Sequence, residues 1–404
     1  MASQSGLSGL AAASRNLDVI GNNIANANTT GMKGSRVEFS EVVTASLGAG
    51  SGTGDGIGVS VATVSQSFSQ GNITMTGNNL DVAINGNGFF QLLLPDGTTA
   101  YSRAGQFKLD SQGNMVASTG GKVLGYQTST AGVPTSVTAT PLKLPTSAPI
   151  AAKPTSSISA EFNLDARAPI AATATPPTPL STYGTALTGY DSQGVTLPVS
   201  LYFQRVAPAA AATDQWNVYD SLTGASVGSL VFDATGKLTS GSPMTLSLTP
   251  PAPSTVAAFP VTVDFSKATQ YGANFSVSNL TQDGYPPGSL TSLKIGKDGV
   301  ITTNYSNGQS QASGMLALAD FRNVQGLAQI DGGNWVETSS SGQPIQGQPG
   351  QGKFGTTQSG ALEDSNIDLT AELVNMMTAQ RAYQASAQTI KTQDAIMQTL
   401  VNMR

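Results

Sequence analysis

The chain has neither cysteine nor histidine among its 404 residues. The absence of cysteine excludes disulfides and thiolate nucleophiles. The absence of histidine excludes an imidazole base, a histidine-liganded metal and a Ser-His-Asp triad. A chain without cysteine is typical of a cytosolic protein and equally of an exported protein that must stay free of cross-links, so both remain open. Glycosidase-type chemistry by a pair of distant acidic residues stays open, but nothing in the sequence selects such a pair. We expect no enzyme, no bound metal and no cofactor.

Charge is also scarce: charged residues make up 11% of the chain, and the formal net charge is -5. The 19 lysines and arginines are scattered, whereas binding to nucleic-acid phosphates requires a clustered basic face. No stretch approaches roughly 18 uninterrupted apolar residues, so we expect no membrane insertion. The opening MASQSGLSGLAAASRN lacks a basic segment followed by an apolar one, so no cleavable secretory signal is expected.

The segment nearest to a nucleotide-binding motif runs from Gly347 to Lys353. Its spacing fits a phosphate-binding loop, but Phe354 stands where Ser or Thr must hold magnesium. Pro349 also removes a backbone N–H that such a loop would use. The segment therefore adds no expectation of a nucleotide cofactor.

Apolar residues at helical spacing occur near both ends of the chain. Near the start they recur at steps of three and four, as Leu10, Ala13, Leu17, Ile20 and Ile24. Near the finish one column recurs every seven residues, as Leu369, Met376, Tyr383, Ile390 and Met397, beside a second column of Leu373, Ala387 and Val401. The spacing predicts two amphipathic helices. Neither helix can bury its stripe alone, so each must pack on the other or on a neighbouring copy, which favours assembly over catalysis.

The expected ends of these helices follow from local signals. The first helix is predicted to run to about Asn26 and to stop at Gly31. The second is predicted from about Ile367 to Met403, roughly 55 Å at 1.5 Å per residue.

Four polar residues lie at the start of this predicted second helix. Ser365, with Asp368 three residues later, forms a capping signature. Glu363 and Asp364 are expected to be helix-start charges that complement the helix dipole.

The middle of the chain reads as β-structure broken by turns. Asp96-Gly97 lies between two strand-like runs and predicts a hairpin. Asp-x-x-Gly segments at 110–113, 191–194 and 233–236 lack the spaced acidic ligands of a calcium loop, so we interpret them as turns. Both tryptophans lie in strand-like runs and are expected to pack in cores.

The predicted fold class is mainly β with long α-helices at both termini. Residues 1–30 and 361–404 would form a helical, coiled-coil-like domain, and the Gly-rich range 31–70 a connector. Residues 71–145 and 285–360 would form one β-domain, into which a second, outer β-domain at 146–284 is inserted between Pro-rich crossings.

Several segments resemble the bacterial flagellar rod and hook axial protein family. Residues 17–33, LDVIGNNIANANTTGMK, are similar to its N-terminal signature and include Asn22, Asn23 and Asn26. The other matching segments are LDVAINGNGFFQL at 80–92, YSRAGQF at 101–107, DGYPPG at 283–288 and ELVNMMTAQRAYQASAQTIKTQD at 372–394. They occur in the order that the family shows.

The resemblance implies a self-assembling structural subunit. The large central domain favours a subunit of the hook, a curved helical tube that acts as a universal joint between motor and filament. The Gly-rich stretch between Phe39 and Val59 leaves a distal rod-type subunit as the alternative. Outside the family, the alternative is an exported β-rich adhesin or carbohydrate-binding protein.

The resemblance also implies partners and a location. The expected partners are further copies of the chain in a homopolymer, the distal rod and hook–filament junction proteins, and a hook cap during assembly. Neither nucleic acid nor a membrane is an expected partner. The protein would be extracellular, exported through the flagellar type III channel without a cleaved signal. The expected polymer surface is Leu10, Leu17, Ile20, Ile24, Leu369, Leu373, Met376, Tyr383, Ile390, Met397 and Val401, with hinges around 31–70 and 141–146.

Overall fold

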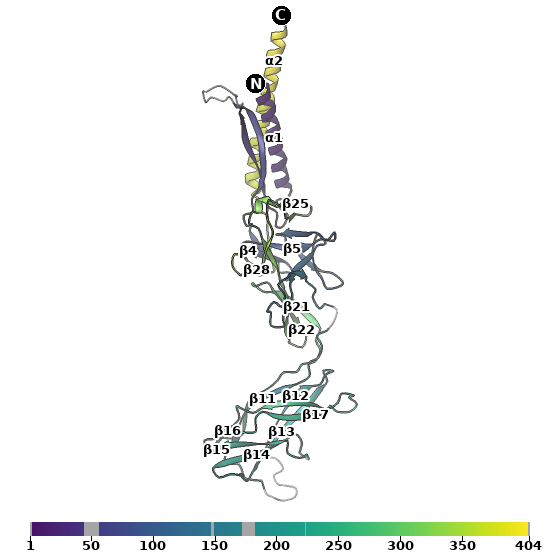
Figure 1. The fold of residues 1–404 in the computed structure, drawn as a ribbon, viewed down its shortest axis with the longest axis vertical. Coiled ribbons are helices and arrows are strands. Elements are labelled where there is room, and N and C mark those ends of the chain that lie inside the picture. Colours follow the sequence, from purple (N-terminus) through teal and green to yellow (C-terminus); the bar gives the residue numbers. More distant parts are fainter. Residues whose placement is uncertain (1, 44–55, 147–148, 172–181, 223, 403–404) are drawn as a thin grey trace. The chain divides into compact units, whose positions relative to one another are not determined.

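The computed structural model describes residues 2–43, 56–146, 149–171, 182–222 and 224–402 (Figure 1). Strands dominate the chain, with one long helix at each end, α1 (Ala2–Ala25) and α2 (Leu369–Asn402). This confirms the expected fold class of a mainly β protein with terminal helices. The chain divides into two compact units: unit 1 is Met1–Ser147, Thr291–Asn304 and Ser310–Arg404, and unit 2 is Ala148–Leu290 and Tyr305–Gln309.

Helix α2 begins slightly later than its sequence pattern indicates. The carboxylate of Asp368 accepts hydrogen bonds from the backbone N–H groups of Thr370 (2.9 Å) and Ala371 (3.2 Å), so Asp368 is the N-cap. The hydroxyl of Ser365 instead accepts the N–H of Ile367 at 3.2 Å, outside the helix. The sequence pattern thus predicts the cap at Ser365, three residues too early, because an aspartate satisfies the free N–H groups as well as a serine does.

The range 31–70, expected to be a connector, contains a long antiparallel hairpin of β1 (Ser35–Val43) and β2 (Gly56–Gln66). The Gly-rich residues 48–55 lie outside the described residues, whereas Gly58 belongs to β2. The hairpin packs on α1, where the N–H of Val59 donates to the hydroxyl of Ser8 at 3.3 Å. A Cβ on Gly58 would lie 2.2 Å from that hydroxyl oxygen, so this glycine permits close approach rather than flexibility.

The rest of unit 1 is an antiparallel β-domain. Its strands are β3 (Ile73–Met75), β4 (Val82–Asn85), β5 (Phe89–Leu93), β6 (Thr99–Ser102), β7 (Phe107–Leu109), β8 (Met115–Ala117), β9 (Lys122–Tyr126), β10 (Thr140–Pro141), β21 (Leu290–Ile295), β22 (Val300–Tyr305), β23 (Ser310–Leu316), β24 (Leu318–Asp320), β25 (Ala328–Ile330), β26 (Asn334–Val336), β27 (Ile345–Gly347), β28 (Thr356–Ser359) and β29 (Ala361–Glu363), with a 3-10 turn at Val324–Gly326. The main sheet runs in the order β21-β22-β23-β9-β5-β6-β26-β25. The pairs β28–β4 and β29–β3 join the last strands of the chain to its first β-domain strands.

Unit 2 consists of two five-stranded sheets around one core. Its strands are β11 (Ser157–Asp165), β12 (Tyr183–Tyr190), β13 (Thr196–Val206), β14 (Thr213–Tyr219), β15 (Gly228–Asp233), β16 (Leu238–Ser240), β17 (Met244–Leu248), β18 (Phe259–Asp264), β19 (Thr269–Tyr271) and β20 (Ser276–Gln282). One sheet orders β12 to β16 in sequence, and the other centres on β18 and β11. Phe162 of the second sheet and Phe265, which directly follows β18, contact Phe203 of the first sheet. Trp216 in this core and Trp335 in unit 1 are both fully buried, which confirms the expected core roles.

The Asp-Gly segments are turns, as expected. Gly97 has φ +87° between β5 and β6, and the carboxylate of Asp96 accepts the N–H of Thr98 at 2.9 Å. Asp110 accepts the N–H groups of Gln112 and Asn114, both at 2.8 Å, between β7 and β8. These carboxylates thus accept hydrogen bonds from backbone N–H groups within the turns and do not form cation-binding loops.

The base of unit 2 extends further along the chain than expected. Isolated bridges pair Ile150 with Gly288 and Lys153 with Tyr285, so residues 285–290 belong to unit 2 rather than to the first β-domain. Residues 305–309 join them because the side chain of Asn307 donates to the carbonyl of Pro286 at 2.7 Å. The expected domain boundary rests on amino-acid composition, and composition does not show which residues pair.

Asp283 fastens this base. Its carboxylate accepts the N–H of Ser156 (2.8 Å) and of Ser157 (2.9 Å), the hydroxyl of Ser156 (2.6 Å) and the ammonium of Lys153 (2.9 Å). Burial by itself raises the pKa of the Asp283 carboxyl, but the hydrogen bonds from the two serines and the lysine outweigh it and hold the pKa well below its usual range.

We predict that Asp283→Asn lowers the free energy of unfolding of unit 2 by about 2 kcal/mol, because four donors lose a charged acceptor. A depressed carboxyl pKa stabilises the fold fully above pH about 4, and the contribution is lost as the pH falls through the folded-state pKa. The difference between wild type and variant should therefore shrink below pH 4. Unfolding monitored by Trp216 fluorescence in a Trp335→Phe background measures it, and a difference that grows in acid contradicts the assignment.

Candidate functional site

The two terminal helices pack against each other along a seam of small residues. A Cβ on Gly6 would lie 3.2 Å from Cγ1 of Ile390, and a Cβ on Gly9 would lie 3.3 Å from the hydroxyl of Ser386. Position numbers rise on α1 as they fall on α2, so the helices are antiparallel, and Figure 1 shows both chain ends at the same end of the pair. Ala379, 5% exposed, continues the seam on α2. Small residues at these points let the helix backbones approach closely.

Helix α1 is covered on two sides. Ile20 is 5% exposed, and Leu10, Leu17 and Ile24 are half-buried. Ala13 of the expected stripe is buried, and so are Ala12, Val19 and Asn23, which do not belong to that stripe. The sequence pattern indicated a single stripe; the additional buried positions arise because the β1–β2 hairpin packs on α1 in addition to α2.

Helix α2 is covered on one side only. Of its expected residues, Met376 and Ile390 are half-buried. The exposed expected residues, with their exposed fractions, are Leu369 (45%), Leu373 (47%), Tyr383 (38%) and Met397 (56%). Val401 lies in the last turn of α2, and its side chain is outside the described set.

Further apolar residues on the helices escaped the heptad pattern. The exposed ones are Leu7 (62%), Val374 (50%), Met377 (53%) and Ile396 (51%). Leu369, Leu373 and Met377 are spaced four apart and form one ridge on the first turns of α2. A search for residues at steps of four as well as seven would have found Met377. The exposed apolar surface of α2 is thus larger than its sequence periodicity indicates.

Asn23 joins the end of α1 to the start of the hairpin. Its side chain donates to the carbonyl of Ser35 at 2.7 Å and accepts the N–H of Ser35 at 3.0 Å, and it is 2% exposed. Asn26 lies beyond the last helical turn and donates to the carbonyl of Asn22 at 3.0 Å. Of the three asparagines of the N-terminal motif, the side chains of Asn23 and Asn26 therefore end the helix and set the direction in which the chain leaves it.

The chain passes between the helices and the β-domain at one place, which we call the junction: residues 31–34, 67–72 and 363–366 together with Arg103. Glu363 lies at its centre. Its carboxylate accepts the ammonium of Lys33 at 2.6 Å, the guanidinium of Arg103 at 3.0 Å and the N–H of Gly71 at 3.0 Å. We call Lys33, Glu363 and Arg103 the Glu363 cluster.

Burial dominates the electrostatics of the Glu363 cluster. Burial lowers the pKa of Lys33, while the hydrogen bond and charge of Glu363 oppose that change. Burial also lowers the pKa of Arg103, again opposed by Glu363. Both cations have further partners: Lys33 donates to the carbonyl of Ser69 at 2.8 Å, and Arg103 donates to that of Gly86 at 2.8 Å. Arg103 also lies over the ring of Phe89, 5.3 Å from its centroid.

The expectation that Glu363 is a helix-start charge is wrong. Glu363 is the last residue of β29 and pairs with Ile73 of β3, which turns its side chain into the protein, where it is fully buried. The neighbouring carboxylate of Asp364 accepts the hydroxyl of Thr74 at 3.2 Å. Lys33 and Arg103 both lie in segments that resemble the family, but no local spacing connects them to a glutamate far along the chain.

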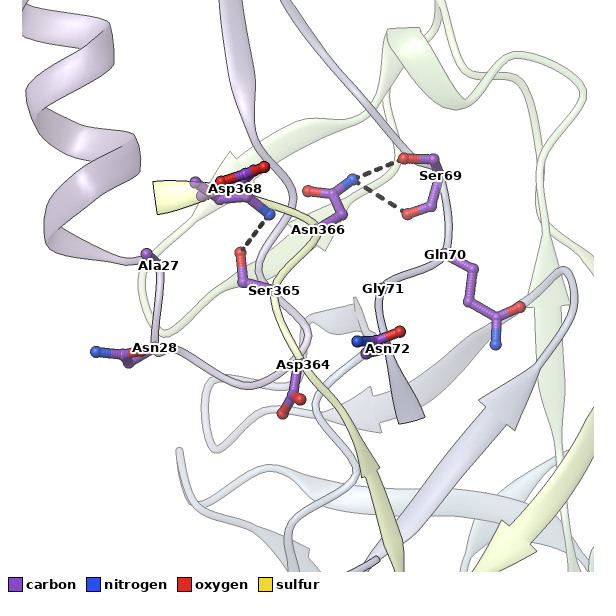
Figure 2. A pocket seen from close by; sticks show the side chains of 11 residues that line it. Ala27, Asn28, Ser69, Gln70, Gly71, Asn72, Asp364, Ser365, Asn366 and Asp368 are labelled. Carbon is purple, nitrogen blue, oxygen red and sulfur yellow. Dashed lines mark hydrogen bonds between the residues drawn. The ribbon is translucent and has the colours of Figure 1, made fainter. Parts of the chain in front are cut away.

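A polar hollow of about 570 Å³ opens beside the junction. Figure 2 shows Asn366 at its wall, with its amide nitrogen donating to the hydroxyl and the carbonyl of Ser69, at 3.0 and 3.1 Å. The amide oxygen of Asn366 accepts the N–H of Gly34 at 2.8 Å. These polar groups hydrogen-bond segments of the chain to one another. We therefore interpret the hollow as part of the junction rather than as a ligand site.

Within the described ranges, no three acidic side chains gather where a metal ion would bind. Neither helix, as far as it is described, is long and apolar enough to cross a membrane.

Four family models match the chain, in order along it. They are described as flagella basal body rod protein (residues 4–33), flagellar hook protein FlgE/F/G D1 domain (83–156), flagellar basal body protein FlaE D2 domain (163–285) and flagellar basal body rod FlgEFG protein C-terminal (358–403). The first and last of these models cover the two helices, and the middle two cover β-structure of both units.

Similar proteins span the whole chain. The flagellar hook protein FlgE of Escherichia coli is 41% identical over 422 residues, covering 100% of both chains. That of Salmonella typhimurium is 39% identical over 415 residues, covering 98% of each. That of Borreliella burgdorferi is 32% identical over 445 residues, covering 99% of this chain and 98% of the relative.

A solved structure supports the fold. The crystal structure of Helicobacter pylori flagellar hook protein FlgE2 matches with a TM-score of 0.53 at 14% sequence identity. The match covers 72% of this chain and 100% of that one. At this identity the likeness concerns the fold alone.

We predict that Asn23→Ala destabilises the packing of α1 on the hairpin by about 2 kcal/mol, because the N–H and carbonyl of Ser35 lose their buried partner. Amide hydrogen exchange in α1 and β1 of the full chain measures the loss as faster exchange. Asn22→Ala is the control: Asn22 is exposed, and its replacement should leave exchange almost unchanged. Equal effects of the two variants would show that Asn23 has no special role.

Proposed function

Since this chain belongs to the flagellar hook protein family and is a structural subunit of the flagellar hook, we propose that its terminal helices are the surface through which copies polymerise. The observation that supports the proposal is the uncovered apolar side of α2. Leu373, Val374 and Met377 are each about half exposed on adjacent turns of one helix. Exposed apolar patches of this kind mark interaction surfaces.

The energetic argument is direct. Fully burying one side chain of this size stabilises a contact by about 1.5–3 kcal/mol. These side chains are already about half buried, so each adds about half of that amount. Contacts from both helices to several neighbouring copies are therefore needed to exceed the cost of association, about 4–15 kcal/mol. Isolated helices are marginal in water, which gives both α1 and α2 more order inside a polymer than outside it.

The proposed polymer surface keeps the expected residues and adds the ridge residue. Its members are Leu10, Leu17, Ile20, Ile24, Leu369, Leu373, Met376, Met377, Tyr383, Ile390, Met397 and Val401. Those half-buried in one chain hold α1 against α2, and those exposed meet other copies. We propose no catalytic activity, since the relatives are structural hook proteins.

A patch that binds a different patch on the next copy does not close on itself, and its repetition produces a helical polymer. We propose that this polymer is a curved tube with the helices in its inner layer, which bends as a universal joint. Unit 2 then acts as an inserted outer domain. We propose a hinge at 141–146. We propose none at 31–70, because the Glu363 cluster and Asn366 hold Lys33 and Gly34 in this range.

The proposed partners are further copies of this chain, the distal rod, the hook–filament junction proteins and a hook cap. We also propose extracellular location after export through the flagellar type III channel without N-terminal cleavage. An intact mass of the subunit in isolated hooks tests the last point, since a processed N-terminus would contradict it. The alternatives lose support: the full-length relatives are hook proteins rather than rod subunits or adhesins.

We predict that Leu373→Asp raises the protein concentration needed for polymerisation more than tenfold while the monomer keeps its stability, because Leu373 is 47% exposed within one chain. Electron microscopy and sedimentation measure the polymer, and thermal unfolding measures the monomer. The matched control is Leu222→Asp, a leucine of 46% exposure in unit 2. Normal tubes from the Leu373 variant would contradict the proposed surface.

We predict a different outcome for Ile390→Asp, which places a charge against Gly6 in the seam. It should abolish polymerisation and also separate α1 from α2, because an unpaired charge cannot remain in this contact. Circular dichroism should show helix loss in the monomer, while the β-rich units stay folded. Retention of full helix content would mean that the seam does not hold the pair.

A further inference from the structure

The Glu363 cluster takes no part in the proposed polymer surface. The side chains of Lys33, Glu363 and Arg103 are 0%, 0% and 6% exposed. Among the described residues, no second carboxylate lies within 4.0 Å of either cation. Asp320 acts on Arg103 only at longer range and is paired with Lys353 at 2.7 Å. Two buried cations therefore share one carboxylate.

The members of the cluster lie far apart along the chain. Lys33 precedes Glu363 by 330 residues, and Arg103 precedes it by 260. A chain whose last strand is not yet in place has both cations and no counter-charge for them. A buried charge without a partner is strongly unfavourable, and each of these cations also repels the other. The charge of Arg103 accordingly acts against the charged form of Lys33.

We propose that the Glu363 cluster makes closure of the junction conditional on β29, the last strand of the chain. A single step then fixes three parts of the chain to one another: residues 31–34, the β-domain at Arg103 and the start of α2. Helix α1 and its hairpin become fixed to the β-domain only when β29 is in place. If the helix pair is the polymer surface, as proposed above, a subunit with an open junction cannot present that surface in one orientation, which withholds it from assembly.

Backbone hydrogen bonds at the junction also involve Glu363 and the residue after it, Asp364. The N–H of Gly31 donates to the carbonyl of Glu363 at 2.8 Å, and that of Asp364 donates to the carbonyl of Asn72 at 2.8 Å. The N–H of Gly71 donates to the Glu363 side chain. These amides report closure of the junction directly, independently of polymerisation.

The test is amide hydrogen exchange on the full-length monomer of three variants. Glu363→Gln keeps the shape of the side chain but leaves two cations facing a neutral amide. Exchange at Gly31, Gly71 and Asp364 should accelerate at least tenfold. Lys33→Met leaves one cation and one carboxylate, and exchange should stay within about threefold of wild type.

The double variant Lys33→Met/Glu363→Gln restores the wild-type net charge of the cluster. Its junction amides should exchange at least threefold more slowly than those of Glu363→Gln alone. Asp283→Asn is the matched control, since it neutralises a hydrogen-bonded carboxylate of unit 2 and should leave the junction amides unchanged.

Equal acceleration in Lys33→Met and Glu363→Gln would overturn the proposal, because it would mean that each side chain only fills space. The absence of rescue in the double variant would overturn it as well. If Glu363→Gln does not fold, Lys33→Met still decides: native exchange supports the proposal, and loss of protection contradicts it.

Discussion

The buried carboxylate of Glu363 sets the path of the chain between its helices and its β-domain. A carboxylate taken out of water requires cations and N–H donors around it, and Lys33, Arg103 and Gly71 supply them. Each donor comes from a different crossing of the chain. Once the carboxylate is placed by the pairing of β29 with β3, the segments after α1 and after the hairpin converge on it through Lys33 and Gly71.

The helix pair above the junction has the opposite character. Gly6 and Gly9 face Ile390 and Ser386 across its seam, and the missing side chains of the two glycines let the helices approach closely. Much of the apolar surface of α2 is left over, including Leu373 and Met377. A subunit that satisfied all of its apolar surface internally would have no reason to polymerise. The firm junction and the incompletely covered helices are therefore complementary features of a hook subunit.

Unit 2 is stabilised by its own aromatic core between two sheets, in which Trp216 and Phe203 are fully buried. Its turns are held by aspartates that bind backbone N–H groups, and its base is fastened by Asp283. These interactions are internal to unit 2. They support the proposal that it is a separate domain inserted between two segments of unit 1.

The sequence by itself determined the class of the fold, both helices, the Asp-Gly turns and the family, because these depend on periodicity and on contacts between near neighbours. The helix ends were right to within a few residues for the same reason, although Asp368 rather than Ser365 became the cap. Only the tertiary structure decided that Glu363 is buried with Lys33 and Arg103, that a hairpin covers a second side of α1, and that residues 285–290 belong to unit 2. Each of these depends on partners distant along the chain, and no local pattern records which distant residue a buried charge or a free strand edge will meet.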